Sequence, residues 1–341
     1  MLNSQPRSRG LIRLAAAIVG LPLLFLLLMT AYYFLPTAAR TDTVRVQPDS
    51  NLRQIVDRLY AKKLLRFPNL FVLTVRLKKE ERKLQAGLYE IKAGSSPRLI
   101  LHKLLKGETA TVRVTIPEGW SSREIGELLE RKDLCPRESF LSVVEARQLE
   151  GFLFPNTYFV PSQFTAEGIA LLFVKGFESF WSADYETRAR AQNLSVRSII
   201  TLASIIEREA KLDSEKPIIS SVFYNRLRRG MKLEADPTIL YALGSWNIRL
   251  TRRQLFTRSP YNTYLHRGLP PGPICNPGKT SLLAALNPAR TNYLFFVANG
   301  DGTHIFSRTG SEQAAAIRMI KARQAASQEK PDTGLEPDGS E

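Results

Sequence analysis

The sequence contains little cysteine and histidine, which argues against two common kinds of site. Only two of the 341 residues are cysteines, Cys135 and Cys275, and neither belongs to a C-x-x-C pair. The three histidines, His102, His266 and His304, are scattered without the spacing of metal ligands. A structural zinc site is therefore not expected, and the sequence leaves open whether the two cysteines form a disulfide.

Acidic residues are also in deficit. Lys and Arg number 48 against 32 for Asp and Glu, which gives a formal net charge of +16. Such a basic surface favours an anionic partner, and nucleic acid, acidic lipid and anionic cell-wall polymer all meet that description. Hydrophobic residues make up 44% of the chain, which is enough for the cores of two domains of ordinary size.

One long stretch lacks charge altogether. Leu14–Leu35 is twenty-two residues without a charged side chain, long enough to cross a hydrocarbon core of about 30 Å as a helix. Three arginines precede it, so the positive-inside rule predicts that residues 1–13 are a cytoplasmic tail. The alternative is a cleaved signal peptide, but the run is long for one and no small-x-small cleavage site follows.

A retained helix at residues 14–35 would be a single-pass anchor in the inner (plasma) membrane. The remainder of the chain would then lie outside the cytoplasm, on the periplasmic side of that membrane. This topology weakens the nucleic-acid interpretation of the positive charge, so no nucleic-acid partner is expected. A cell-wall partner is favoured instead.

The first extracytoplasmic unit is predicted to be a small α+β module at residues 43–116. Strands are expected at 43–46, 87–91 and 111–116, and helices at 49–62, after Pro68 and at 96–106. In this layout the module resembles the LysM-like domain of peptidoglycan-binding proteins. The alternative is a spacer that only holds the next domain away from the membrane.

Residues 117–324 predict a helix-rich α+β domain. Its helices are expected at 121–132, 136–148, 166–191, 195–210, 215–228, 236–243 and 311–324, with a hairpin of strands at 293–298 and 303–306. The tail at 325–341 is rich in Pro, Asp, Glu and Gly, which predicts disorder.

The helix expected at 195–210 carries one carboxylate in an unusual position. At roughly 100° per residue its aliphatic side chains form one apolar arc, and Glu207 falls inside that arc. Arg208 and Glu209 point to the flanks, as expected of solvated residues. A carboxyl group in the arc loses water, which favours its neutral form, as a general acid requires. The competing interpretation is a snorkelling or ion-paired glutamate with no chemistry.

Further candidates lie near helix ends and on a stiff loop. Asn225 and Asp236 lie close to the ends of the helices that follow Glu207, although Asp236 is first of all an expected N-cap. A long Pro-rich loop begins with the sequence YNTY, whose side chains can hydrogen-bond sugar hydroxyls and N-acetyl groups. The candidate substrate-binding residues are Asn225, Asp236, Tyr261, Asn262, Thr263 and Tyr264.

Four segments together resemble the endolytic murein transglycosylase family, also called YceG-like. With the anchor and the LysM-like module, the resemblance covers nearly the whole chain outside the tail. Two departures, Glu234 where many members have Gln and Gln313 where a His is common, leave subsite contacts in doubt. The four segments are EGFLFPNTY (150–158), LASIIERE (202–209), VFYNRL…GMKLEADPT (222–238) and SPYNTY…GLPPGPICNPG (259–278).

The resemblance implies a reaction. The enzyme would cleave the β-1,4 bond between N-acetylmuramic acid and N-acetylglucosamine of peptidoglycan glycan strands without water, leaving a 1,6-anhydromuramyl end. Glu207, the first Glu of the SI-x-E-x-E motif, would be the catalytic acid and base. No metal or organic cofactor is implied, and cell-wall synthesis proteins are candidate partners. A non-catalytic wall-binding scaffold and a lysozyme-like muramidase that uses water remain open alternatives.

Overall fold

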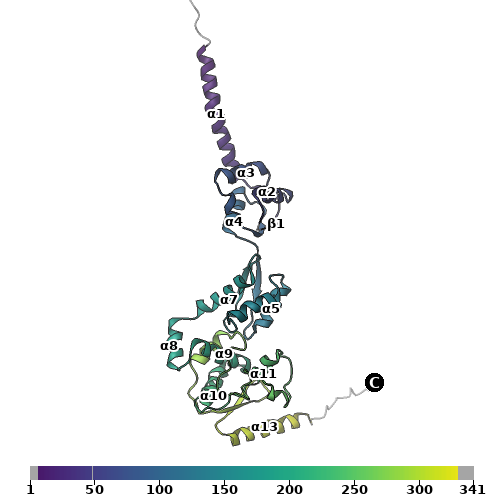
Figure 1. Cartoon of the computed structure of the whole chain (residues 1–341), viewed down its shortest axis with the longest axis vertical. Coiled ribbons are helices and arrows are strands. Elements are labelled where there is room, and N and C mark those ends of the chain that lie inside the picture. The colour runs from purple at the N-terminus through teal and green to yellow at the C-terminus, as the bar shows by residue number, and fades with distance from the viewer. Residues whose placement is uncertain (1–6, 48, 329–341) are drawn as a thin grey trace, which may run out of the picture. The chain divides into compact units, whose positions relative to one another are not determined.

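The computed structural model describes residues 7–47 and 49–328, with side chains from Val19 to Ala325 except Pro48. The chain forms two compact units, one of residues up to Arg113 together with 159–164, the other of residues 114–158 together with the chain from Thr165 onward (Figure 1). Each has its own buried apolar cluster. The described residues form three sheets of two strands each among many helices, which confirms the predicted helix-rich α+β class.

The first unit contains one antiparallel strand pair and three short helices after its leading helix. Asp42 of β1 lies opposite Ile91 of β2, and the pairing runs to Val46 and Gly87. The strands and helices expected here are all found, whereas the LysM-like assignment stays a prediction. The elements are α1 (Arg7–Phe34), β1 (Asp42–Val46), α2 (Leu52–Ala61), α3 (Pro68–Leu77), a 3-10 turn (Glu81–Lys83), β2 (Gly87–Ile91) and α4 (Pro97–Lys106).

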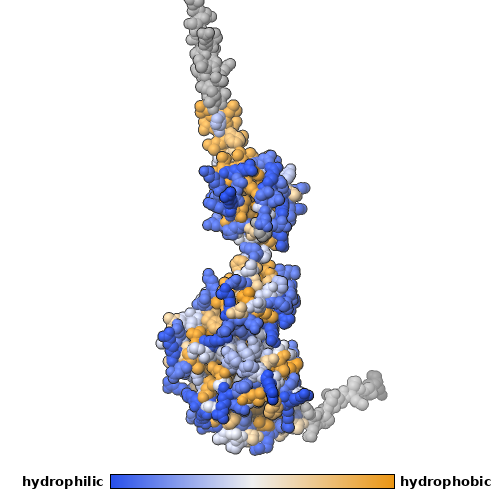
Figure 2. All heavy atoms as spheres, in the orientation of Figure 1, coloured by the Kyte–Doolittle hydropathy of each residue, from blue (hydrophilic) through white to orange (hydrophobic). Residues whose placement is uncertain are grey.

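The predicted membrane segment falls on α1. Apolar side chains from Val19 to Leu28 are 51–67% exposed where they are described, and Figure 2 shows them as a continuous apolar surface on this helix. Over the described part of the chain, no helix is long and apolar enough to cross a membrane. The predicted span begins at Leu14, ahead of the first described side chain, and residues 1–6 of the predicted tail lie outside the described residues.

The second unit is mostly helical. In its hairpin, Phe295 lies opposite Ser307 in an antiparallel pair, as expected. The part of the predicted tail after Gln328 lies outside the described residues. The strands β3 and β4 contribute residues to both units. From β3 onward the elements along the chain are β3 (Thr111–Thr115), α5 (Ser122–Arg131), α6 (Arg137–Ala146), β4 (Thr157–Pro161), α7 (Ala166–Phe180), α8 (Ala183–Ala191), α9 (Val196–Glu209), a 3-10 turn (Asp213–Glu215), α10 (Lys216–Arg228), α11 (Asp236–Leu243), a 3-10 turn (Gln254–Phe256), α12 (Lys279–Leu286), β5 (Phe295–Ala298), β6 (His304–Ser307) and α13 (Gly310–Gln328).

Two features differ from expectation. The single helix predicted at 166–191 is two helices, because the Ser182 side chain accepts a hydrogen bond from the Tyr185 backbone N–H and starts α8 afresh. The helix α12 was not foreseen, since its N-cap is Gly278 at the end of the Pro-rich loop. This omission matters because α12 packs along α9 and supplies groups to the candidate site.

Candidate active site

The helix α9 is the centre of the second unit. The Ser195 side chain caps it by accepting a hydrogen bond from the Ser198 backbone N–H at 3.1 Å. Every residue from Ile199 to Ile206 is buried, and α10, α11 and α12 all pack against the helix. Burial of this run fixes the last turn of α9, which carries Glu207 and Glu209.

Glu207 is held by three donors. Its Oε2 atom accepts hydrogen bonds from the Ser281 hydroxyl at 2.6 Å and the Gly278 backbone N–H at 3.0 Å, and it lies 3.5 Å from Lys216 Nζ. The side chains of Glu207 and Lys216 are only 10% and 4% exposed. These contacts fit a carboxylate that ties the end of α9 to α12 and α10, as in the ion-paired interpretation of the sequence.

A second carboxyl group, missed in the sequence, lies beside Glu207. Burial and the charge of Glu207 raise the pKa of Glu118, and the ammonium of Lys216 opposes that rise. A Cβ atom at Gly278 would overlap the Glu118 carboxyl group, so the close approach depends on a glycine there. In the sequence, the Pro117-Glu-Gly119 turn after the third predicted strand was the feature that could have identified Glu118 as a candidate site residue.

Glu209 is not the solvated flank residue that the helical pattern predicts. It is partly buried, and burial together with the negative charge of Asp236 raises its pKa to about 8, with Arg226 opposing the rise. No described residue donates a hydrogen bond to its carboxyl group. Glu209 therefore holds its proton at neutral pH.

Two of the predicted substrate-binding residues, Asp236 and Tyr264, interact with Glu209. The Tyr264 hydroxyl donates a hydrogen bond to Asp236 Oδ1 at 2.7 Å, and burial, with Asp236 beside it, raises the pKa of Tyr264. The expectation that Asp236 caps α11 is wrong, because Ala235 is the N-cap and Asp236 is the first helical residue. The Asp236 carboxyl group is thereby available to Tyr264.

Three other predicted binding residues are buried and satisfied within the protein. The Asn225 amide donates to the carbonyl oxygens of Thr291 and Tyr293 at 2.9 and 2.8 Å. The Asn262 amide donates to two backbone carbonyl oxygens at 3.0 and 2.8 Å. The Thr263 hydroxyl oxygen accepts a hydrogen bond from the Ala235 backbone N–H. They hold the loop and the hairpin in place, and their side chains are not presented to a ligand.

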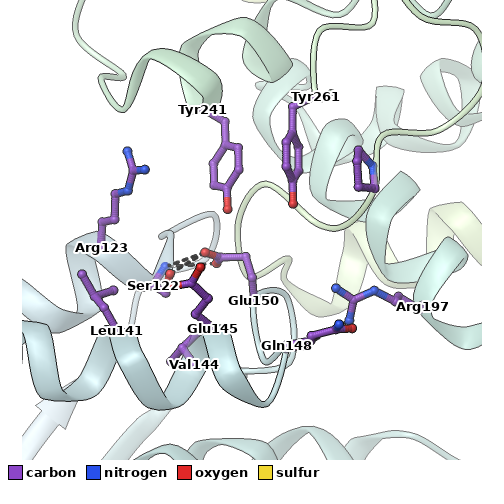
Figure 3. A pocket seen from close by; sticks show the side chains of 11 residues that line it. Ser122, Arg123, Leu141, Val144, Glu145, Gln148, Glu150, Arg197, Tyr241 and Tyr261 are labelled. Atoms are coloured by element: carbon purple, nitrogen blue, oxygen red, sulfur yellow. Dashed lines mark hydrogen bonds between the residues drawn. The ribbon is translucent and has the colours of Figure 1, made fainter. Parts of the chain in front are cut away.

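Tyr261, the remaining predicted residue, lines a cavity of about 580 Å³ (Figure 3). At its floor lies Glu150, which accepts hydrogen bonds from the backbone N–H and hydroxyl of Ser122 at 3.0 and 2.5 Å and from the Asn276 amide at 3.3 Å. Burial raises the pKa of Glu150 to about 7. Neither Glu207 nor Glu209 lines this cavity.

Other sequence-based points concern cysteine, metal and Glu234. Cys135 and Cys275 are both free thiols. No group of three or more His, Cys, Asp or Glu in the described ranges is arranged to hold a metal ion. Glu234, one of the two departures from the family pattern, forms an ion pair with buried Arg226 at 3.2 Å.

Comparison with known proteins agrees with the motifs. The model of the YceG-like family matches residues 44–319. An endolytic murein transglycosylase of Bacillus subtilis (strain 168) is 34% identical over 68% of this chain and 72% of that protein. One of Streptococcus pneumoniae is 29% identical over 75% of this chain and 54% of its own length. A solved structure of a yceG-like protein from Listeria monocytogenes superposes with a TM-score of 0.53 at 33% identity, covering 81% of this chain and 98% of that one.

The family model spans the elements that build this site, from the strand pair of the first unit to α13. The relatives extend over more than two thirds of the chain at an identity that implies a shared fold. The chain therefore belongs to the YceG-like family.

Proposed function

We propose that this protein is a peptidoglycan lytic transglycosylase that cuts glycan strands internally. The family relatives named endolytic murein transglycosylases support this proposal. The observation that carries it is a partly buried carboxyl group at the end of α9, Glu209, which lies beside an aspartate hydrogen-bonded to a phenol and whose pKa burial and that aspartate raise to about 8. Such a group is the general acid that glycosidic bond cleavage needs.

In the proposed reaction the acid protonates the glycosidic oxygen that leaves from C1 of the muramyl residue. The resulting carboxylate then takes the proton of the muramyl 6-hydroxyl as that oxygen attacks C1. One C–O bond breaks, another forms within the same sugar, and the carboxyl group regains its proton. The product is a 1,6-anhydromuramyl end, and water is not consumed.

The sequence predicts Glu207 for this role, and its position in the apolar arc and beside Glu118 still supports it. The contacts favour Glu209. Glu207 is engaged by three donors, including an ammonium group, and these contacts tie it to α10 and α12. Glu209 lacks such donors and holds a proton that it can give up. We therefore assign Glu209 as the acid and base, and Glu207 as the residue that positions the last turn of α9.

Asp236 and Tyr264 are proposed to assist Glu209. A developing oxocarbenium ion needs negative charge or an oriented dipole close by. The Asp236 carboxyl group and the Tyr264 hydroxyl hydrogen-bonded to it can supply both. In this proposal Asn225, Asn262 and Thr263 support the loop and hairpin rather than contact the glycan.

Membrane attachment completes the proposal. The uncharged run at residues 14–35 and the exposed apolar side chains of α1 support insertion of this helix into the inner (plasma) membrane, with the rest of the chain on the periplasmic side. The module at residues 43–116 is proposed to bind peptidoglycan in the LysM-like manner. Cell-wall synthesis proteins stay candidate partners.

Digestion of purified sacculi tests the proposed function. The full chain, purified in detergent, is incubated with sacculi, and the new glycan ends are identified by mass spectrometry. Internal cuts with 1,6-anhydromuramyl ends are expected. Binding without any new ends would mean that the protein is a wall-binding scaffold instead.

A further inference from the structure

The cavity of about 580 Å³ in the second unit has no assigned ligand. Its lining comes from α5, α6, α9, α11 and the Pro-rich loop (Figure 3). It is the size of a small-molecule site and collects several convergent polar groups. The proposed acid and its partners do not line it, so the cavity needs an explanation of its own.

Charged groups of both signs face the cavity with few partners. Arg123 and Glu145 are exposed, and neither forms a hydrogen bond or an ion pair with a described residue. Arg197 donates through Nη1 to the Gln148 carbonyl oxygen at 3.0 Å, and its Nη2 lies at the cavity wall next to Tyr261. Two guanidinium groups and a carboxylate are therefore available to one ligand.

The two tyrosines that line the cavity direct their hydroxyl groups into it. Tyr241 and Tyr261 are in tilted contact, with ring centroids 4.9 Å apart and an angle of 52° between the ring planes. Figure 3 shows both hydroxyl groups directed into the cavity toward Glu150. These hydroxyl groups suit a ligand with many hydrogen-bonding groups.

The cavity shares the Pro-rich loop and α11 with the partners of the proposed acid. The loop that holds Tyr264 also holds Tyr261, and α11 carries both Asp236 and Tyr241. The Tyr264 contact with Asp236 and the Tyr261 contact with Tyr241 are thus five residues apart on α11, which is about 7.5 Å along the helix axis.

We propose that this cavity binds the peptide attached to a muramyl residue of the strand. The ligand class is a short peptide with free carboxylates and one amine, with Arg123 and Arg197 binding carboxylates and Glu145 binding the ammonium group. The proposal rests on the proposed function and adds a substrate preference to it, namely that peptide-bearing strands are bound more tightly than bare glycan.

The test compares two substrates made from one glycan preparation, with peptides intact and with peptides removed by an amidase. The full chain is expected to show a higher kcat/KM on peptide-bearing strands. Arg123→Ala should lower the ratio of the two kcat/KM values about tenfold, through KM, because a charge-assisted hydrogen bond is lost. Glu145→Gln should lower it in the same sense. Arg318→Ala, which removes an exposed cation on α13, is the matched control and should leave the ratio unchanged.

Two results would overturn the peptide site. One is wild-type cleavage of both substrates with equal kcat/KM. The other is a loss in Arg123→Ala that is equal on both substrates, which would instead indicate a site for sugar. If wild type cuts neither substrate, the proposed function fails. Binding of the free tetrapeptide to the full chain, measured by calorimetry, then tests the cavity as a peptide site. Binding weakened by Arg123→Ala would then support the site, and absence of binding would refute it.

Discussion

Replacing each glutamate of the last turn of α9 by glutamine should have opposite effects on stability. Glu209 has a pKa of about 8 in the folded protein and about 4.3 in an unfolded chain. Between these values the folded state binds a proton that the unfolded state releases, so the free energy of unfolding falls as pH rises from about 4 to 8. At pH 7 this amounts to on the order of 3 kcal/mol.

Glu209→Gln should remove that loss, because glutamine stays neutral at every pH. The variant should be more stable than wild type at pH 7, by up to about 3 kcal/mol, and nearly equal to it at pH 4. Glu207→Gln should be less stable by about 1–3 kcal/mol, because the buried Lys216 ammonium loses one of its two ion pairs and keeps the one with exposed Asp213.

Chemical denaturation of the second unit at pH 4 and pH 7 measures both effects, and digestion of sacculi measures activity. Glu209→Gln should lose about 10²–10⁴-fold in rate, the usual contribution of general acid–base catalysis. Glu207→Gln should retain most activity at temperatures where it is folded. Glu178→Gln, on the exposed face of α7, is the control for both assays. If Glu207→Gln is stable and inactive while Glu209→Gln is active, the assignment to Glu209 is refuted and the sequence-based choice stands.

Three further predictions follow from the same site. Because cleavage requires protonated Glu209, kcat/KM should fall as pH rises through about 8. The residual activity of Glu209→Gln should not show this fall. A pH profile that is the same in the variant as in wild type would indicate another acid. In heavy-oxygen water the muramyl ends should carry no label and be one water lighter than a reducing end, whereas labelled reducing ends as the main product would identify a muramidase. Gly278→Ala should lower the free energy of unfolding by about 1–3 kcal/mol in denaturation curves, because its Cβ overlaps the Glu118 carboxyl group; a neutral result would show that this carboxyl group moves freely.

Local patterns were enough to predict the elements but not the contacts of the site. The capping signals and period of 3.6 residues located α9, α10 and the hairpin. The same helical pattern assigned solvent to Glu209, since a helical wheel gives the direction of a side chain and not what packs against it. The donors to Glu207 come from Lys216, Gly278 and Ser281. Gly278 and Ser281 lie at the start of α12, a helix that was not predicted because it directly follows the Pro-rich loop.

The contacts of the loop residues 261–264 could not be predicted from the sequence either. Asn, Thr and Tyr side chains were expected to contact sugar because of their chemistry, yet their neighbours in the fold decide their use. Asn262 and Thr263 are turned inward, Asn262 to backbone carbonyl groups that precede it and Thr263 to the backbone N–H at the start of α11. Tyr261 and Tyr264 on either side of them face the cavity and Asp236. Which residues of such a loop turn inward depends on groups distant in sequence.

The spacing of the two glutamates gives a reason for both to be present. Residues two apart on a helix point about 200° away from each other, so Glu207 and Glu209 meet different neighbours on opposite sides of α9. On one side, the N-terminus of α12 and Lys216 supply the hydrogen-bond donors that hold Glu207. On the other, Asp236 and burial favour the proton of Glu209. The carboxylate of Glu207 fixes the helical turn that carries Glu209. Replacing Glu207 therefore removes contacts that hold this turn, whereas replacing Glu209 removes both the acid and the stability loss at neutral pH that its raised pKa causes.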